Sequence, residues 1–255
     1  MKYTYKQYKE LIDLPYFDKL MWSKGLIASA IKNSKNFGVS LSWGKDSVVM
    51  AHLVHSMCKK GYYIFANTKC EYPETYKYIG EMLKGIFKDY NYIETEPIKT
   101  FNQCVNEYGY PHLRQNTGQG NKRTPQCCKF LKEKPLDDKK KELGIDLEFV
   151  GLQTSESMNR RLVFMRLGGY YYKKTTKRHC ALPMAIWTDK DVFRYAKENN
   201  IPLNPLYKQM KRTGCMFCTG FKDWRKVMAK YNPKMYSYIL ERTDGQKTID
   251  CDWII

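Results

Sequence analysis

Two pairs of cysteines are spaced for holding a metal centre. Cys127 and Cys128 are adjacent, and Cys215 and Cys218 form a Cys-x-x-Cys pair. A Cys-x-x-Cys pair on a turn brings two thiolates together, which suits a tetrahedral metal ion or two corners of an iron–sulfur cluster. Because structural zinc sites separate paired cysteines by two to four residues, the adjacent pair favours a bulkier [4Fe–4S] cluster. Zinc is the chief alternative, and four unligated buried thiols are the other.

A second chemical motif is the turn Ser42-Trp43-Gly44-Lys45-Asp46-Ser47, between an alternating apolar run and apolar residues at helical spacing. Small residues let the backbone approach a ligand closely, and the N-terminus of a helix attracts anions. The Lys45 ammonium adds a point charge, and the hydroxyls of Ser42 and Ser47 can donate hydrogen bonds to phosphate oxygens. The turn therefore predicts phosphate binding, with a plain structural turn as the alternative.

Asp46 is unusual in an anion site, and a role in orienting Lys45 or in holding Mg²⁺ would explain it. The spacing does not fit Gly-x-x-x-x-Gly-Lys-Ser/Thr, so an ordinary Walker site is disfavoured.

Composition limits the classes of protein. The chain has 255 residues, 43% of them hydrophobic, and a formal net charge of +18. The charge favours a polyanionic partner, either nucleotide or nucleic acid, although composition bias toward lysine would also produce it. No apolar run approaches the ~20 residues of a membrane span, and the N-terminus lacks a signal-peptide core. We therefore expect a cytoplasmic protein without a membrane partner, in which the nine cysteines serve metal or redox chemistry rather than disulfides.

Alternating strands and helices should position these motifs. Apolar patterning predicts strands near 36–41, 62–66, 90–95 and 146–152, and helices near 4–33, 46–59, 73–87, from 125 and from 188. This alternation predicts an α/β fold with a doubly wound, mainly parallel sheet flanked by helices. We expect three parts: an N-terminal helical cap (1–35), a nucleotide-binding domain (36–207) and a Cys-rich C-terminal region (208–255).

The sequence resembles a known family. Ser-x-Gly-Lys-Asp-Ser after the first strand is similar to the pyrophosphate-binding loop of the PP-loop ATP pyrophosphatases, which have the adenine nucleotide alpha hydrolase-like fold. Within them the chain looks most like the iron–sulfur type of the phosphoadenosine-phosphosulfate (PAPS) reductase family. The likeness runs from about 36 to 222 and includes these stretches: Asn67–Thr75, Gly151–Ser157 with Arg160-Arg161, Pro183…Trp187…Asp191-Val192, Ile201–Tyr207 and Gly214-Cys215.

The resemblance implies a site for an adenine nucleotide, either ATP or a sulfonucleotide (APS or PAPS), beside a [4Fe–4S] cluster. By resemblance, the arginines face the anionic end of the ligand, where a guanidinium can grip oxygens, and the turn at Asn67 lies near the adenosine. The implied nucleotide-binding residues are Ser40, Ser42, Trp43, Gly44, Lys45, Asp46, Ser47, Asn67, Thr68, Gly151, Glu156, Ser157, Arg160 and Arg161. The implied cluster ligands are Cys127, Cys128, Cys215 and Cys218.

Two reactions compete. In the first, ATP is cleaved to AMP and pyrophosphate, with Lys45 and Asp46 as catalytic residues, to adenylate a substrate oxygen that sulfur then displaces. In the second, a cysteine attacks a sulfonucleotide and sulfite is released. By resemblance, the second reaction needs a C-terminal Glu-Cys-Gly-Leu/Ile-His stretch; the chain has Cys251 near that place but lacks the Gly and His. By resemblance, sulfonucleotide reductases tend to lack the loop lysine, so Lys45 favours the first reaction.

The first reaction is that of enzymes that thiolate transfer RNA or DNA, so the resemblance implies a nucleic-acid acceptor as well as the nucleotide. A protein that donates sulfur or electrons, and a homodimer, stay open as further partners. A non-catalytic nucleotide- or nucleic-acid-binding protein is a third alternative, which the intact loop and four intact cysteines disfavour.

Overall fold

The computed structural model describes residues 1–112, 125–221 and 223–243 of the chain. Its centre is a six-stranded sheet with the order β3-β2-β1-β4-β6-β5. The pairs β1·β2, β2·β3, β1·β4 and β4·β6 are parallel, and only the edge strand β5 runs antiparallel to its neighbour. The predicted α/β fold with a mainly parallel sheet is therefore confirmed.

Each predicted strand forms at the expected place. The strands are β1 (Phe37–Ser40), β2 (Tyr62–Ala66), β3 (Asn91–Thr95), β4 (Leu147–Val150), β5 (Tyr170–Lys173) and β6 (Arg178–Ala181). The helices between them are α3 (Lys45–Met57), α4 (Pro73–Lys84), α5 (Phe101–Tyr108), α6 (Gln126–Cys128), α7 (Lys134–Glu142) and α8 (Met158–Leu167). The helices outside the strand region are α1 (Tyr5–Ile12), α2 (Tyr16–Lys32), α9 (Asp189–Glu198), α10 (Trp224–Tyr231) and α11 (Pro233–Thr243).

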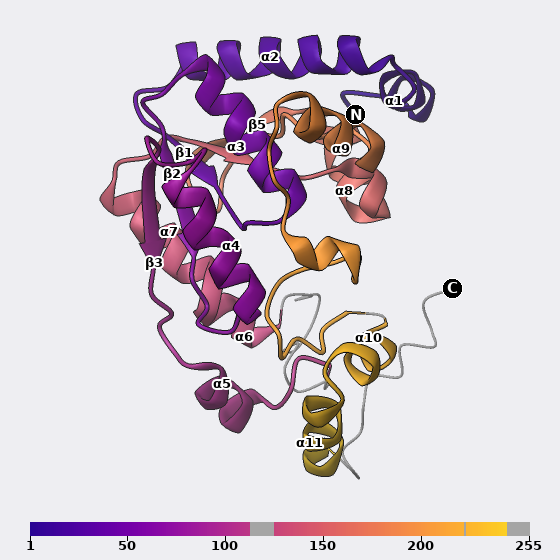
Figure 1. Cartoon of the computed structure of the whole chain (residues 1–255). Helices are drawn as coiled ribbons and strands as arrows, with labels where there is room; N and C mark the ends of the chain where they lie inside the picture. The colour runs from indigo at the N-terminus through magenta and orange to yellow at the C-terminus, as the bar shows by residue number, and fades with distance from the viewer. Residues whose placement is uncertain (113–124, 222, 244–255) are drawn as a thin grey trace.

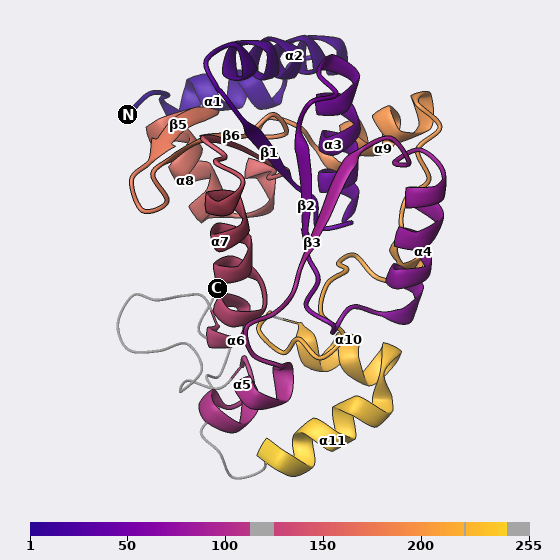
Figure 2. The same cartoon turned by 90° about the vertical axis from the view of Figure 1, so that its left-hand side faces the viewer.

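Helices cover both faces of the sheet. Figures 1 and 2 show α3, α4 and α9 on one face and α7 on the other, while α2 lies across one end of the strands. The helices α10 and α11 lie with α5 at the opposite end of the molecule. Strands that are covered on both faces need continuous apolar sequence, as β1 and β2 have.

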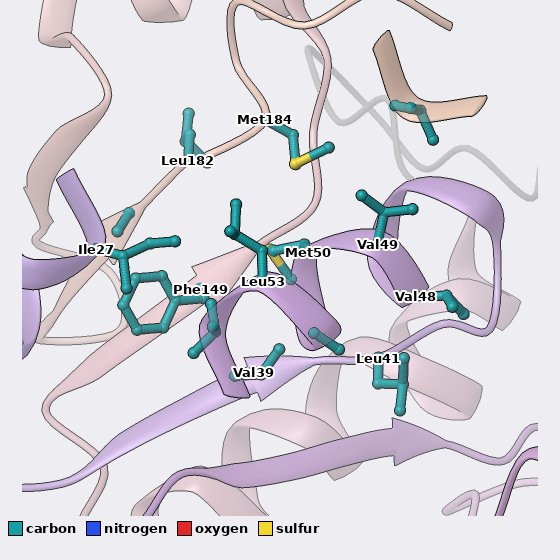
Figure 3. Close-up of a cluster of buried hydrophobic side chains, with 14 of the residues drawn as sticks. Ile27, Val39, Leu41, Val48, Val49, Met50, Leu53, Phe149, Leu182 and Met184 are labelled. Carbon is teal, nitrogen blue, oxygen red and sulfur yellow. The ribbon is translucent and has the colours of Figure 1, made fainter. Parts of the chain in front are cut away.

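The core between α3 and the sheet consists of buried apolar side chains. Figure 3 shows Val48, Val49, Met50 and Leu53 of α3 packed with side chains of β1, β4 and α2. All four are fully buried. This packing fixes the first turn of α3, which carries the predicted phosphate-binding motif, against the end of β1.

The N-terminal helical segment is two helices rather than one. Thr4 caps α1 with a side chain that accepts from the amide of Gln7, and α1 ends at Ile12. Pro15 then precedes α2, because proline fits the start of a helix and disrupts its interior. A buried ion pair, Lys19 Nζ to Asp191 Oδ2 at 2.9 Å, ties α2 to α9.

A π-helical turn, Lys129–Glu133, joins α6 to α7. Pro135 lies just beyond it, and a proline ring clashes with the carbonyl four residues earlier, so a wider turn relieves the clash. Within the described part of the chain, no helix has the length and apolar character needed to cross a membrane.

Candidate functional site

One cavity lies where the order of the strands in the sheet reverses. The chain passes from β1 to β2 on one side and places β4 on the other side of β1, so a crevice opens at the carboxyl ends of these strands. A cavity of about 580 Å³ occupies this position and is lined by Ser40, Ala66 and Gly151 from the ends of β1, β2 and β4. Its volume is typical of a site for a small molecule.

The loop between β1 and α3 forms one wall of this cavity. The Ser47 hydroxyl donates to the Gly44 carbonyl at 3.0 Å and accepts from the amide of Ser42 at 3.1 Å. The Lys45 amide donates to the hydroxyl of Tyr207 at 3.0 Å. Of the described residues, none accepts from the amides of Asp46 and Ser47, which belong to the first turn of α3. These two amides are therefore available to an anion at the helix N-terminus.

The Lys45 side chain is buried in the cavity wall and forms ion pairs with two carboxylates. Its Nζ lies 2.9 Å from Asp46 Oδ2 and 2.7 Å from Asp189 Oδ1. Gln153 donates from Nε2 to Asp46 and, at 3.2 Å, to Asp189. Burial opposes the charge of Lys45, but the hydrogen bond to Asp189 and the charge of Asp46 outweigh it and raise the Lys45 pKa. Lys45 is therefore a permanent cation, and Asp46 orients it.

Two glycines allow the backbones to meet at the loop. A Cβ on Gly151 would lie 3.0 Å from Ser47 Cα and 3.1 Å from the Ser47 nitrogen. A Cβ on Gly44 would lie 3.1 Å from the Tyr207 hydroxyl. Side chains at either position would push the loop away from the strand ends, so both glycines are needed for this close approach.

The lining of the cavity is strongly basic. Arg160, Lys211, Arg212 and Lys132 line it together with Lys45, against the carboxylates of Asp46, Glu71 and Glu156. Burial lowers the Arg160 pKa, and the charge of Arg212 lowers it further. Such crowding of cations is relieved when an anion enters, so the cavity is built for a negatively charged ligand.

Most predicted nucleotide-binding residues come together in this cavity. Those that line it are Ser40, Ser42, Gly44, Lys45, Asp46, Ser47, Gly151, Glu156, Ser157 and Arg160. Trp43, Asn67, Thr68 and Arg161 do not line it. Cys251 lies outside the described residues.

The residues that do not line the cavity have structural contacts of their own. The Trp43 ring is fully buried against Tyr78, Phe87 and Tyr92, and its backbone has the rare φ of 58°. Trp43 therefore anchors the loop in the core, and only its backbone can approach a ligand.

Asn67 and Thr68 shape the turn after β2. Asn67 Nδ2 donates to Glu94 at 2.7 Å, and the Thr68 hydroxyl donates to Glu71 at 3.0 Å. Arg161 lies with its guanidinium 5.5 Å from the centre of the Tyr8 ring. These side chains hold the walls of the cavity in place rather than forming its surface.

A second cavity, of about 450 Å³, brings the cysteines together. Cys128, Cys215 and Cys218 line it, and Cys127 is buried in the same apolar cluster. The Cys215 loop is docked by backbone pairing with Glu71, and the Met216 amide donates to the Cys70 carbonyl at 2.7 Å. The structure therefore brings the two cysteine pairs, far apart in sequence, into one region, and three of the four thiols line the cavity.

The thiols have different tendencies to ionise. A hydrogen bond between the adjacent cysteines keeps the proton on Cys127, which raises its pKa and lowers that of Cys128. Burial raises the pKa of both Cys215 and Cys218. Lys132 lies beside them, 3.8 Å from Glu71 Oε1, and its charge favours the thiolates of Cys128 and Cys215.

The sulfur donors are of the kind that an iron–sulfur cluster takes. In the described ranges, no three His, Cys, Asp or Glu side chains are close enough to hold one metal ion. Cys128, Cys215 and Cys218 at one cavity, with Cys127 buried in the adjoining apolar cluster, could supply the Cys₄ ligation of an iron–sulfur cluster, whose corners are farther apart than the ligands of one zinc.

The two cavities share a wall. The segment Lys211–Gly214 and the side chain of Lys132 line both of them. Sequence reasoning did not assign this wall, nor Gln153, Asp189 and Tyr207, which hold the loop. Their positions along the chain could have indicated these residues, because Gln153 follows the carboxyl end of β4 and Asp189 is the first residue of α9.

Known proteins resemble this chain in sequence and in fold. The family model described as phosphoadenosine phosphosulfate reductase domain matches residues 36–221. An adenosine 5′-phosphosulfate reductase of Lysinibacillus sphaericus is 28% identical over 180 residues, which are 70% of this chain and 71% of that protein. One from Bacillus cereus (strain B4264) is 24% identical over 220 residues, 85% of this chain and 88% of that protein.

Among solved structures, a phosphoadenylyl-sulfate reductase from Candida auris, in a phosphate complex, has a TM-score of 0.59 and 17% identity. The match covers 84% of this chain and 97% of that one. This likeness supports the fold.

Proposed function

The chain belongs to the phosphoadenosine phosphosulfate reductase domain family, and from this premise we propose that it is an adenylating enzyme of sulfur transfer. It binds ATP in the cavity at the ends of β1, β2 and β4. A substrate oxygen attacks the α-phosphorus, the bond to the β-phosphate oxygen breaks and pyrophosphate leaves. A sulfur nucleophile then displaces AMP from the adenylated substrate.

The single observation that carries this proposal is the state of Lys45. Its ammonium is buried at a helix N-terminus, is held between Asp46 and Asp189, and faces a basic cavity. A cation fixed in this way stabilises the charge that develops on departing pyrophosphate without reorganising during the reaction. Free backbone amides of α3 add to the same effect.

The remaining residues have roles that follow from their positions. Arg160 and Arg212, which also line the cavity, neutralise phosphate oxygens, and Asp46 orients Lys45 or holds Mg²⁺ with the phosphates. Cys127, Cys128, Cys215 and Cys218 would hold a [4Fe–4S] cluster. When bound, such a cluster supplies a place to carry or activate sulfur, or to transfer electrons.

The second candidate is reduction of a sulfonucleotide with release of sulfite. It is favoured by the curated relatives, which are named adenosine 5′-phosphosulfate reductases and span up to 85% of this chain. The same cavity would accept either ligand, because both present an adenosine with phosphorus-linked oxyanions. The candidates differ in their products: adenylation releases pyrophosphate, whereas in the reductase the cysteine displaces the nucleotide from sulfur and a second thiol then releases sulfite.

One experiment separates them. The anaerobically purified, iron-reconstituted protein is incubated with ATP, APS or PAPS, and AMP, pyrophosphate and sulfite are measured. Pyrophosphate from ATP, lost in Lys45→Met, supports adenylation. If APS or PAPS with a thiol yields sulfite, and Cys251→Ser abolishes this product, the reductase candidate is supported in place of adenylation. Absence of both products from a protein that binds no nucleotide would overturn both candidates.

A further inference from the structure

A third cavity, of about 510 Å³, lies between α7 and the hairpin formed by β5 and β6. Figure 2 shows these elements on the side of the sheet away from α4. The cavity is lined by five basic side chains and three carboxylates, so its surface is net positive. None of these eight side chains has a role in the nucleotide site described above. The basic residues are Lys129, Lys134, Lys140, Lys173 and Arg178.

The cavity contains a buried cation with an unsatisfied donor. Arg178 is only 3% exposed and is paired with Asp137 through its terminal nitrogen. Its Nε has no hydrogen-bond partner among the described residues, and neither does the buried hydroxyl oxygen of Thr176, which lines the same space. Buried donors of this kind normally have an acceptor, so an incoming oxyanion would satisfy them.

The hairpin extends this positive surface into solvent. Its sequence from 173 to 178 is Lys-Lys-Thr-Thr-Lys-Arg, with four basic residues and no acidic one. Lys173, Lys174 and Lys177 are exposed, as is Lys134 on the facing helix α7. A pocket for one phosphate needs no such extension, whereas a chain of phosphates would meet these lysines in succession.

The cavity also adjoins the nucleotide. Ser40 and Leu136 line both this cavity and the one at the strand ends. At the junction, the buried ammonium of Lys140 donates to the Ser40 hydroxyl at 2.9 Å and to Glu148 at 2.6 Å. A strand held on the hairpin would therefore lie next to the reacting phosphate.

We propose that the cavity between α7 and the β5–β6 hairpin binds the phosphodiester backbone of a nucleic acid and leads it to the nucleotide cavity across Ser40 and Leu136. This inference rests on the proposed function, since it identifies the acceptor of the adenylation as a nucleic acid. The contacts are to phosphates, so they fix the position of the strand and do not read its sequence.

The test measures binding of fluorescently labelled single-stranded RNA and DNA of one sequence by anisotropy, over a range of salt concentrations. The variant replaces Lys173, Lys174 and Lys177 by glutamine. Loss of three phosphate contacts should lower the slope of log affinity against log salt by about 2, and weaken binding about 100-fold at 0.1 M salt. RNA binding stronger than DNA binding, or the reverse, identifies which backbone is preferred.

The matched control replaces three exposed lysines elsewhere, Lys60, Lys84 and Lys88, by glutamine. It removes the same charge and should keep wild-type affinity and salt slope. ATP binding, measured by calorimetry, should be the same in the wild type and both variants, because none of the six lysines lines the nucleotide cavity.

The outcomes are distinct. Failure of the wild type to bind either nucleic acid while it binds ATP overturns this inference and leaves the proposed function standing. Equal losses in the variant and the control overturn it too, since they indicate diffuse charge. If adenosine 3′,5′-bisphosphate alone binds and loses affinity in the hairpin variant, the cavity serves a mononucleotide and the inference is overturned. If neither the wild type nor either variant binds ATP, the proposed function fails, whatever the result with nucleic acid.

Discussion

Replacing Lys45 by methionine removes the ammonium from the cavity and keeps the length of the side chain. The ammonium lies 2.9 Å from Asp46 Oδ2 and 2.7 Å from Asp189 Oδ1. The Lys45 side chain is 7% exposed, that of Asp46 17% and that of Asp189 61%. Asp189 is therefore the partner that a bound phosphate displaces most readily.

The expected loss follows from these contacts. A unit charge about 4 Å from a phosphate oxygen contributes about 4 kcal/mol at an effective dielectric constant of about 20. The phosphate must replace the exposed pair with Asp189, which is worth at most about 1 kcal/mol. The difference of about 3 kcal/mol corresponds to roughly 150-fold weaker binding of ATP.

Calorimetric titration with ATP and with adenosine tests this reasoning. Lys45→Met should weaken ATP binding and leave adenosine binding unchanged, because adenosine has no phosphate. The control is Lys77→Met, an exposed lysine of α4 outside the cavity lining. An ATP dissociation constant within about threefold of wild type would refute the reasoning, as would equal losses for ATP and adenosine in a variant with an unchanged melting temperature.

Two further predictions concern packing and pH. Gly151→Ala should weaken ATP binding at least tenfold, because the added methyl group would lie 3.0 Å from Ser47 Cα. The control Gly80→Ala has open space around the added methyl group, so it should leave ATP binding unchanged and stabilise α4 by about 0.5–1 kcal/mol. Calorimetry measures ATP binding, and thermal melts measure stability. Burial and the charge of Arg225 lower the pKa of His112 to about 4. Since this folded-state pKa is below the unfolded value of about 6.5, unfolding takes up a proton between these values, and stability should be full above pH 6.5 and fall by roughly 3 kcal/mol toward pH 4. Denaturant titrations should show a flatter pH profile for His112→Phe, and an identical profile would contradict the assignment.

Local patterning predicts the parallel part of the fold. The strands from 36 to 41 and from 62 to 66 are short apolar runs bounded by turns, and β1 and β2 form there. The start of α9 is also predictable from the spacing of Thr188 and Asp191, which suits a helix N-terminus. In the structure the amide of Thr188 donates to the carboxylate of Asp191, three residues on. Such signals lie within a few neighbouring residues, so the sequence alone contains them.

The edge hairpin has no comparable signal. Strand β5 consists of three tyrosines and a lysine, partly or fully exposed, and β6 has only four residues. Neither shows the alternation of a half-buried strand, because β6 takes its place by pairing with β4, which is more distant in sequence, and β5 in turn pairs with β6 at the edge of the sheet.

The site divides in the same way. The loop from Ser42 to Ser47 is one continuous segment, so its chemistry can be predicted from residue types. The contact between Lys45 and Asp189, and the docking of the Cys215 loop on Glu71, join residues more than 100 positions apart. No local pattern specifies such pairs. Trp43 shows the converse, since its place in the motif suggests a ligand contact but its ring is buried in the core.

The wall formed by Lys211–Gly214 separates the nucleotide cavity from the cysteines, and both spaces use its two faces. If the proposed nucleotide and cluster bind on its two sides, this shared segment gives each a route to affect the other, and any such coupling is reciprocal: the factor by which the cluster changes nucleotide affinity equals the factor by which the nucleotide changes cluster affinity. With such coupling, removal of the proposed cluster would change nucleotide affinity even though no residue of the loop from Ser42 to Ser47 had been altered.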